Sequence, residues 1–222
     1  MNLADEARNV IAAAMARHAG EACLTCSFQA EDMAVLHMAR EFQPGLPVLF
    51  LETGYHFPET IAYRDEMAQR WGLNLINLEA RLSRLEQERQ FGNLYQSDPN
   101  RCCRLRKVEP LMQGLEAYRL WITGLRREQS PTRRDLKVEE EQQLPSGKLI
   151  VKLNPLAAWS WKEVLAYAAV HEIPLLPLYE QGYTSIGCAP CTSKPSDPSN
   201  PRSGRWGGTK LECGIHTFGR KE

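Results

Sequence analysis

The feature that most restricts the fold of this chain is a regular alternation of short apolar runs with amphipathic stretches. Strands that alternate with helices at this spacing run parallel, so we expect an α/β fold with a mostly parallel twisted sheet and helices on both faces. Apolar runs predict buried strands at residues 22–28, 47–51, 73–78, 120–123 and 149–153. Apolar side chains at helical spacing predict helices at residues 3–18, 33–39, 58–71 and 159–171.

Two polar turns follow predicted strands and lead into predicted helices. The first contains Ser27, Gln29 and Glu31, and the second contains Thr53 and Gly54. Parallel sheets bind ligands at the carboxyl ends of their strands, and a helix N-terminus attracts anions through its free N–H groups and its dipole. The first turn lacks the glycine-rich Walker A pattern. It is therefore interpreted either as an anion site of another kind or as an ordinary strand–helix turn.

Two close pairs of cysteines are present, Cys102/Cys103 and Cys188/Cys191. Pro190 stiffens the turn between the second pair, so that both thiols point to one side of the bend. A single Cys-x-x-Cys turn is compatible with half of a zinc site, a redox dithiol or chance. If the fold brings the two pairs together, four thiolates suit a [4Fe–4S] cluster or a tetrahedral zinc ion.

Basic residues accompany the first cysteine pair and the fourth predicted strand. Lys107 follows Cys103 by four residues and shares its helical face, where a cation favours thiolate and attracts an anionic ligand. Arg126, Arg127 and Arg133 belong to the loop after the strand. Arginines in this position can bind phosphate or sulfate through paired hydrogen bonds, although a solvated basic loop has the same composition.

Proline, glycine and serine dominate the chain after about residue 195, which predicts a mobile arm. We therefore expect a domain at residues 1–195 and a flexible tail at residues 196–222. Cys213 lies in this tail, three residues before His216. Because the other cysteines are assigned to a strand or to the two pairs, Cys213 is the candidate nucleophile.

The totals limit the classes of function that remain open. A chain of 222 residues buries one sizeable core, and its formal net charge of zero argues against general binding to nucleic acid or membrane surfaces. No apolar run is long enough to span a membrane, and the acidic N-terminus lacks the features of a signal peptide. We expect a cytoplasmic protein whose seven cysteines serve metal or catalytic roles. Cys23 and Cys26 are the exception, because their place in a strand predicts core packing.

Four short motifs occur along the chain: Cys-Cys-x-x-Arg-Lys-x-x-Pro-Leu, Gly-Cys-x-Pro-Cys-Thr, Gly-Arg-Trp and Glu-Cys-Gly-Ile-His. Together they resemble the assimilatory adenylylsulfate (APS) reductases, and the resemblance extends from about residue 20 to 216. It implies an adenine-nucleotide α-hydrolase-like fold related to the PP-loop ATP pyrophosphatases. It also implies reduction of APS to sulfite and AMP, with thioredoxin or glutaredoxin as reductant, and a [4Fe–4S] cluster on Cys102, Cys103, Cys188 and Cys191.

The resemblance also implies roles for single residues. An S-sulfocysteine would form on Cys213, and the external thiol would then release sulfite from it. Arg202 and Arg205 would bind the phosphosulfate together with the arginine loop, and a homo-oligomer is expected. The full set of expected substrate contacts is Ser27, Gln29, Glu31, Thr53, Gly54, Lys107, Arg126, Arg127, Arg133, Arg202, Arg205 and His216.

Three alternatives remain open from the sequence. The nearest is a reductase for the 3′-phosphorylated substrate, PAPS, or for both substrates, although the PAPS reductases that this chain resembles lack the two cysteine pairs. A pyrophosphatase-type ATP enzyme acting on tRNA would need a Ser-Gly-Gly-x-Asp-Ser-like loop, which residues 27–32 do not provide. A zinc-binding interaction module would use the same four cysteines without catalysis.

Overall fold

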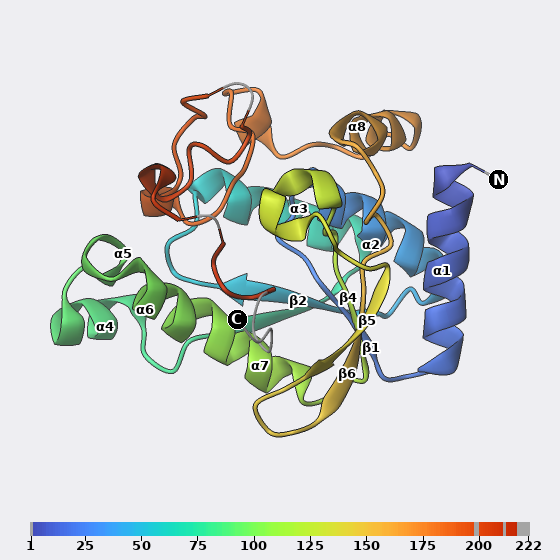
Figure 1. Ribbon diagram of the computed structural model, residues 1–222, viewed down its shortest axis with the longest axis horizontal. Coiled ribbons are helices and arrows are strands. Elements are labelled where there is room, and N and C mark those ends of the chain that lie inside the picture. Colours follow the sequence, from blue (N-terminus) through green and yellow to red (C-terminus); the bar gives the residue numbers. More distant parts are fainter. Residues whose placement is uncertain (1, 198–199, 211, 217–222) are drawn as a thin grey trace.

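The computed structural model describes residues 2–197, 200–210 and 212–216. Its strands form one sheet in the order β3-β2-β1-β4-β6-β5, in which β5 is antiparallel to β6 and the other neighbours are parallel. The predicted mostly parallel sheet is therefore confirmed (Figure 1). The strands are β1 (Ala22–Thr25), β2 (Pro47–Glu52), β3 (Asn74–Glu79), β4 (Leu120–Ile122), β5 (Glu139–Gln143) and β6 (Leu149–Leu153).

Helices cover both faces of the sheet, as the alternating pattern predicts. Successive side chains of β1 point to opposite faces, so Leu24 enters the core beneath α1, α2 and α8, whereas Cys23 enters the core beneath α7. In Figure 1, α2 and α3 lie above β2 and α7 lies below it. The helices are α1 (Leu3–Arg17), α2 (Ala30–Phe42), α3 (Pro58–Trp71), α4 (Arg84–Phe91), α5 (Leu94–Ser97), α6 (Pro99–Cys103), α7 (Glu109–Leu115) and α8 (Trp161–Val170).

The first strand is shorter than predicted. Cys23 and Cys26 are both buried, as expected, but β1 ends at Thr25. The Ser27 N–H donates to the carboxylate of Asp32 at 2.7 Å instead of continuing the ladder, and the next residue, Phe28, has a φ of 60°. These two deviations turn the chain out of the sheet and into α2.

The edge strand β5 was not predicted. Its sequence, Glu-Glu-Glu-Gln-Gln, has no apolar residue from which a strand could be predicted. It pairs antiparallel to β6, and the carboxylate of Glu140 lies 3.2 Å from the ammonium group of the buried Lys152. Polar residues suit an edge strand because they discourage pairing with another chain. Their presence also removes the apolar pattern from which a strand is predicted.

The carboxyl ends of β1 and β4 lie side by side at the point where the order of the strands in the sheet reverses. Open α/β sheets bind ligands at such a point. Asp32 joins the turns that follow these strands, because it accepts hydrogen bonds from the Ser27 hydroxyl at 2.6 Å and from the Gly124 N–H at 3.1 Å. Burial raises the pKa of the Asp32 carboxyl to about 6, while the hydrogen bonds from Ser27 oppose this shift.

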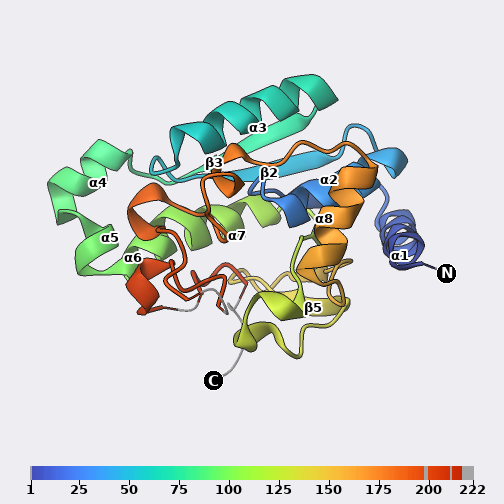
Figure 2. The same ribbon diagram turned by 90° about the horizontal axis from the view of Figure 1, so that it is seen from above.

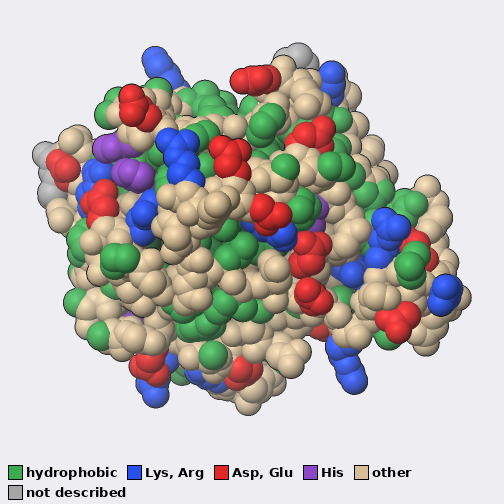
Figure 3. Space-filling view, turned by 180° about the vertical axis from the view of Figure 1, so that it is seen from behind, with side chains coloured by type: hydrophobic (Ala, Val, Ile, Leu, Met, Phe, Trp, Pro, Cys, Tyr) green, Lys and Arg blue, Asp and Glu red, His purple; other side chains and the backbone are tan. Residues whose placement is uncertain are grey.

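In the view from above, the C-terminal segment (the described residues after 200, drawn in red) lies lower in the picture than α6 and α7. It is on the same side of the molecule as β5 (Figure 2). On the face shown in Figure 3, acidic and basic side chains are interspersed, in keeping with the net charge of zero. None of the described helices combines the length and the apolar character needed to cross a membrane.

Gly124 approaches Asp32 so closely that it provides a test of this connection. A Cβ atom at position 124 would lie 2.3 Å from Asp32 Oδ1 and 2.8 Å from the Asp32 backbone nitrogen. We expect Gly124→Ala to lower the free energy of unfolding by about 1–3 kcal/mol, the range for overpacked sites, as measured by urea denaturation. Gly45→Ala is the control, because a Cβ there meets nothing within 4 Å. Equal stability of the two variants would contradict the close contact.

Candidate functional site

A cavity of about 580 Å³ opens between the carboxyl ends of β1, β2 and β4. Its walls come from the turns after β1 and β2, the loop after β4 and the C-terminal segment. The predicted substrate contacts that line it are Ser27, Gln29, Glu31, Thr53, Lys107, Arg126, Arg133, Arg202, Arg205 and His216. Cys213 lines the same cavity. The structure therefore brings the candidate nucleophile together with most of the residues selected from the sequence.

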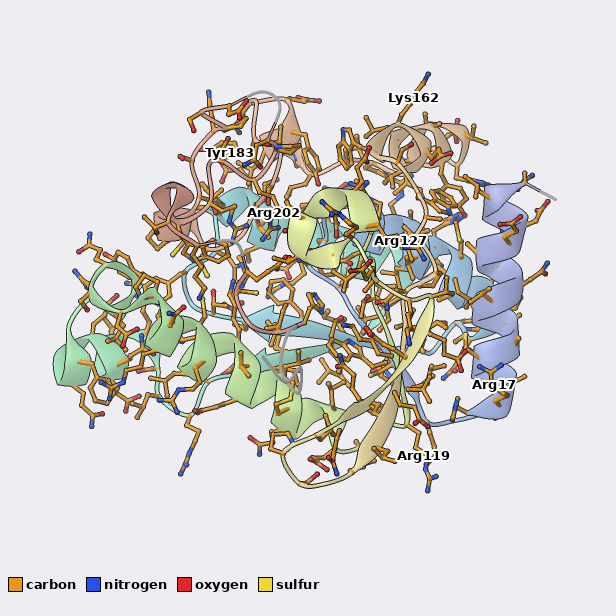
Figure 4. All side chains as sticks on the ribbon, in the orientation of Figure 1. Arg17, Arg119, Arg127, Lys162, Tyr183 and Arg202 are labelled. Carbon is orange, nitrogen blue, oxygen red and sulfur yellow. The ribbon has the colours of Figure 1, made fainter. Side chains whose placement is uncertain are left out.

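Two predicted contacts are not part of this lining. Gly54 has a φ of 72°, which favours glycine, and its N–H donates to Glu52 Oε1 at 2.8 Å within the turn after β2. Arg127 is exposed and donates from Nε to the Leu136 carbonyl oxygen at 2.9 Å. Figure 4 labels Arg127 on the loop after β4 and Arg202 on the C-terminal segment. The structure thus gives Gly54 and Arg127 roles within their loops and not at the cavity wall.

The turn after β1 is held by its own side chains and by a later part of the chain. The amide of Gln29 donates to the Ser27 hydroxyl at 3.1 Å, and its oxygen accepts the Ile186 N–H at 2.8 Å. The Ala30 N–H, at the start of α2, donates to the Tyr179 hydroxyl at 3.2 Å. This turn is therefore fastened to the segment that leads to Cys188.

Arg126 and Glu31 form a buried ion pair in the cavity wall, with Nη2 and Oε1 2.8 Å apart. Arg126 also pairs with Glu128 at 2.7 Å, and Glu31 accepts a hydrogen bond from the Gln129 amide at 2.9 Å. Removing one partner of a buried ion pair strongly destabilises the folded protein, because the other charge is left uncompensated. In this structure two carboxylates therefore neutralise Arg126.

A second group of arginines contacts the C-terminal segment. The carboxylate of Glu212 accepts hydrogen bonds from Arg133 Nε at 2.9 Å, from Arg133 Nη2 at 2.7 Å and from the Thr132 hydroxyl at 3.0 Å. Arg202 Nη2 lies 3.6 Å from the same carboxylate. Burial would raise the pKa of Glu212, but the hydrogen bonds and charge of Arg133 and the charge of Arg202 lower it below its usual range.

A second, smaller cavity is lined by all four paired cysteines, Cys102, Cys103, Cys188 and Cys191. The turn that carries the second pair packs on the turn after β2, because the Cys188 thiol lies 3.3 Å from the Thr53 hydroxyl and the Ala189 N–H donates to the Tyr55 carbonyl oxygen at 2.7 Å. Burial and the neighbouring thiols raise the pKa values of Cys102 and Cys191 to about 11. The structure thus brings the two predicted pairs to one place.

Lys107 and Trp206 line both cavities. Lys107 lies in a π-helical turn, Arg104–Val108, between α6 and α7. Pro110 follows this turn, and a wider turn suits a residue that lacks an N–H and crowds the preceding carbonyls. Burial would lower the pKa of Lys107, but the charges of Cys188, Cys213 and Cys103 raise it above its usual range. The predicted proximity of Lys107 and Cys103 is confirmed, although the turn between them is not α-helical.

The sequence did not indicate the role of Arg106, although it is part of the first cysteine motif. Its buried guanidinium donates to the carbonyl oxygens of Thr53 and Leu82 and to the side chain of Gln87, and it lies over the Tyr55 ring. Arg106 therefore fixes the turn after β2 against the region of α4. Asp32 and Glu212 were also missed, although each directly follows or precedes a selected residue, Glu31 and Cys213 respectively.

The described part of the predicted tail packs against the rest of the protein. Arg205 and Trp206 are buried, and Arg205 forms a β-bridge with Thr192. The His216 ring stacks on Trp121, with centroids 5.5 Å apart and an interplanar angle of 16°. Residues 198–199, 211 and 217–222 of the predicted tail lie outside the described residues. The boundary near residue 195 and the mobility of the tail stay predictions.

The fold is that of the adenine-nucleotide α-hydrolase-like proteins, related to the PP-loop enzymes, as predicted. A family model described as the phosphoadenosine phosphosulfate reductase domain matches residues 21–194. The chain belongs to this family.

Similar proteins agree with this assignment. The chain is 49% identical over 188 residues to an adenosine 5′-phosphosulfate reductase from Rhodococcus erythropolis, covering 84% of this chain and 75% of that protein. It is 41% identical over 214 residues to the protein of the same name from Geobacillus kaustophilus, covering 95% and 89%. The resemblance to the APS/PAPS reductase family that the cysteine motifs indicated is confirmed.

Solved structures show the same fold. A phosphoadenylyl-sulfate (PAPS) reductase from Candida auris, in a phosphate complex, has a TM-score of 0.70 and 26% identity, covering 83% of this chain and 88% of that one. An FMN adenylyltransferase from Candida glabrata has a TM-score of 0.64 and 16% identity, covering 95% and 75%. At that lower identity the likeness shows the fold alone.

Proposed function

We propose that this protein reduces adenosine 5′-phosphosulfate to sulfite and AMP in assimilatory sulfate reduction. The observation that carries the proposal is that Lys107 and Trp206 line both the four-cysteine cavity and the larger cavity lined by Cys213. The relatives from Rhodococcus and Geobacillus are named for this reaction, and the chain covers most of their length. A reactive thiol, a basic cavity and a metal-binding thiol set are thus available at one edge of the sheet.

The phosphosulfate group of the substrate needs several charge-assisted hydrogen bonds, because it carries two negative charges. Lys107 and Arg205 line the cavity and would supply most of them, because the carboxylate of Glu212 already pairs with Arg133 and Arg202 in this structure. Arg205 is 5% exposed, and its Nε has no hydrogen-bond partner among the described residues. A buried donor without a partner is destabilising, so an anionic ligand beside Arg205 would satisfy it.

The four-cysteine cavity fits a [4Fe–4S] cluster better than a single ion. Within the described residues, no group of three or more His, Cys, Asp or Glu side chains is placed to hold one metal ion. A tetrahedral zinc ion, with Zn–S bonds of about 2.3 Å, draws its thiolates to within about 3.8 Å of each other, whereas a cluster spreads them over four irons. We infer that the thiol set Cys102, Cys103, Cys188 and Cys191 would hold such a cluster. When bound, the cluster would supply an electrostatic partner for Lys107.

Cys213 would perform the first chemical step. Its thiolate attacks the sulfur of the sulfuryl group, and the bond between that sulfur and the phosphate oxygen breaks. AMP leaves with the electron pair of that bond, and Cys213 carries an S-sulfonate. Lys107, which lines the same cavity as Cys213, would hold the sulfuryl oxygens during the attack.

An external dithiol of the thioredoxin or glutaredoxin type would complete the reaction. One of its thiolates attacks the Cys213 sulfur, and sulfite leaves with the electron pair of the sulfur–sulfur bond. The second thiol of the reductant then releases Cys213 and becomes part of a disulfide, so the dithiol supplies both electrons. We propose that residues 196–222 form a movable tail, because Cys213 must meet first the substrate and then the reductant.

Action on PAPS is a second candidate. The PAPS reductase from Candida auris shares the fold at 26% identity, and the family model carries the PAPS name. Since the APS-named relatives are the more similar proteins in sequence, we assign APS as the main substrate.

The proposed cluster leads to a prediction about iron. Serine at Cys102, Cys103, Cys188 or Cys191 should lower iron content and activity together, because each thiolate would hold one iron. Cys23→Ala is the control, since Cys23 lies in the core beneath α7 and should leave the iron content unchanged. Iron analysis and visible absorbance of anaerobically purified protein provide the measurement. An active protein without iron would contradict the proposal.

The proposed nucleophile leads to a second prediction. Cys213→Ser should keep its iron and release no sulfite, because a serine hydroxyl is a much weaker nucleophile at neutral pH. Wild-type protein incubated with APS and no reductant should gain one sulfonate on Cys213, as seen by mass spectrometry of the intact protein and its peptides. Thioredoxin should remove this group as sulfite. Turnover by Cys213→Ser, or a sulfonate on another cysteine, would refute the assignment.

A further inference from the structure

Glu212 precedes the proposed nucleophile directly and connects the C-terminal segment to the arginine loop. Its side chain and that of Arg133 are each only 10% exposed, and two parallel hydrogen bonds of 2.9 and 2.7 Å join them. Such a bidentate pair fixes the direction of the carboxylate as well as its position. Arg202 and the Thr132 hydroxyl contact the same carboxylate.

Arg133 is itself held in place by a hydrogen bond to Gln129. Its Nη1 donates to the side-chain oxygen of Gln129, and the nitrogen of the same amide donates to Glu31 Oε1 at 2.9 Å. The carboxylate of Glu31 therefore determines which way the Gln129 amide faces, and the amide in turn orients Arg133. A continuous series of hydrogen bonds thus runs from the first turn of α2 to the residue before Cys213.

We propose that Glu212 is a positioning residue that seats Cys213 at the wall of the substrate cavity by pairing with Arg133 and Arg202. Adjacent Cα atoms are about 3.8 Å apart, so a fixed carboxylate at position 212 confines the thiol at position 213. Gly214 has a φ of 93° and could not hold the thiol alone, because glycine permits many backbone conformations. The catalytic part of the inference rests on the proposed function, whereas the seating of Cys213 does not.

The seating can be measured in the anaerobically purified full-length protein without substrate. Glu212→Gln keeps the size of the side chain and removes its charge. We expect Cys213 of this variant to react with iodoacetamide at least about fivefold faster than in wild type, because the segment opens more often. Peptide mass spectrometry separates Cys213 from the other cysteines. Glu139→Gln is the matched control, since Glu139 pairs with Arg17 on exposed surface of the edge strand and should leave the rate unchanged.

The effect on chemistry is measured as the rate of Cys213 sulfonation by APS in a single turnover without reductant. Glu212→Gln should slow it about 10- to 100-fold, as expected for lost hydrogen bonds to a charged group. Glu212→Asp, which keeps the charge, should recover part of the rate. The dissociation constant of APS, measured in the Cys213→Ser background, should change less than about threefold with Glu212→Gln, because a positioning residue affects the attack and not the affinity.

Three results would overturn the proposal. In the first, Cys213 of Glu212→Gln is alkylated at the same rate as in the wild-type protein, and in the second it is alkylated faster while its sulfonation rate stays unchanged. The third is an affinity for APS that falls in step with the sulfonation rate. The last result would make Glu212 part of substrate binding and not of thiol positioning. Absence of sulfonation in the wild-type protein would instead contradict the proposed function. In that case the alkylation rates alone would still decide whether Glu212 seats Cys213.

Discussion

The charge of Lys107 is the constraint on which the two cavities depend. A half-buried ammonium group is stabilised by negative partners, and the thiols of Cys103, Cys188 and Cys213 would be such partners once ionised. The requirement is mutual, because thiols gathered as closely as those of the smaller cavity raise each other's pKa values unless a cation or a metal stabilises the thiolate form. The π-helical turn before Pro110 places this one cation beside both the paired cysteines and the C-terminal segment.

The sequence predicted the sheet because strands buried on both faces read as continuous apolar runs. β5 could not be found in this way, since an edge strand is stabilised by pairing with β6 and by the contact between Glu140 and Lys152, neither of which leaves an apolar pattern. Spacing identified the two cysteine pairs, whereas their meeting at the smaller cavity depends on the fold. The role of Arg106 was out of reach, because its acceptors on Thr53, Leu82 and Gln87 are distant in sequence and meet only in the fold.

The arginine loop shows why counting basic residues overestimates the charge available to a ligand. Arg126 is neutralised by Glu31 and Glu128, and Arg133 by Glu212. Glu31 and Glu212 could not be paired with these arginines from the sequence, because they come from opposite ends of the chain. The contacts of the tail could not be predicted from the sequence either. Its proline, glycine and serine content predicts a flexible backbone, whereas its contacts with the rest of the protein depend on a few side chains.

The central claim is that a thiol at position 213, beside Lys107, reduces an adenylyl sulfate. The most direct test is an anaerobic assay of sulfite release by the iron-loaded wild-type protein, with thioredoxin as reductant and with APS and PAPS as separate substrates. We expect one sulfite for each AMP formed from APS, and slower release or none from PAPS. Sulfite from PAPS alone would contradict the substrate assignment, and sulfite from neither substrate would contradict the proposed reaction.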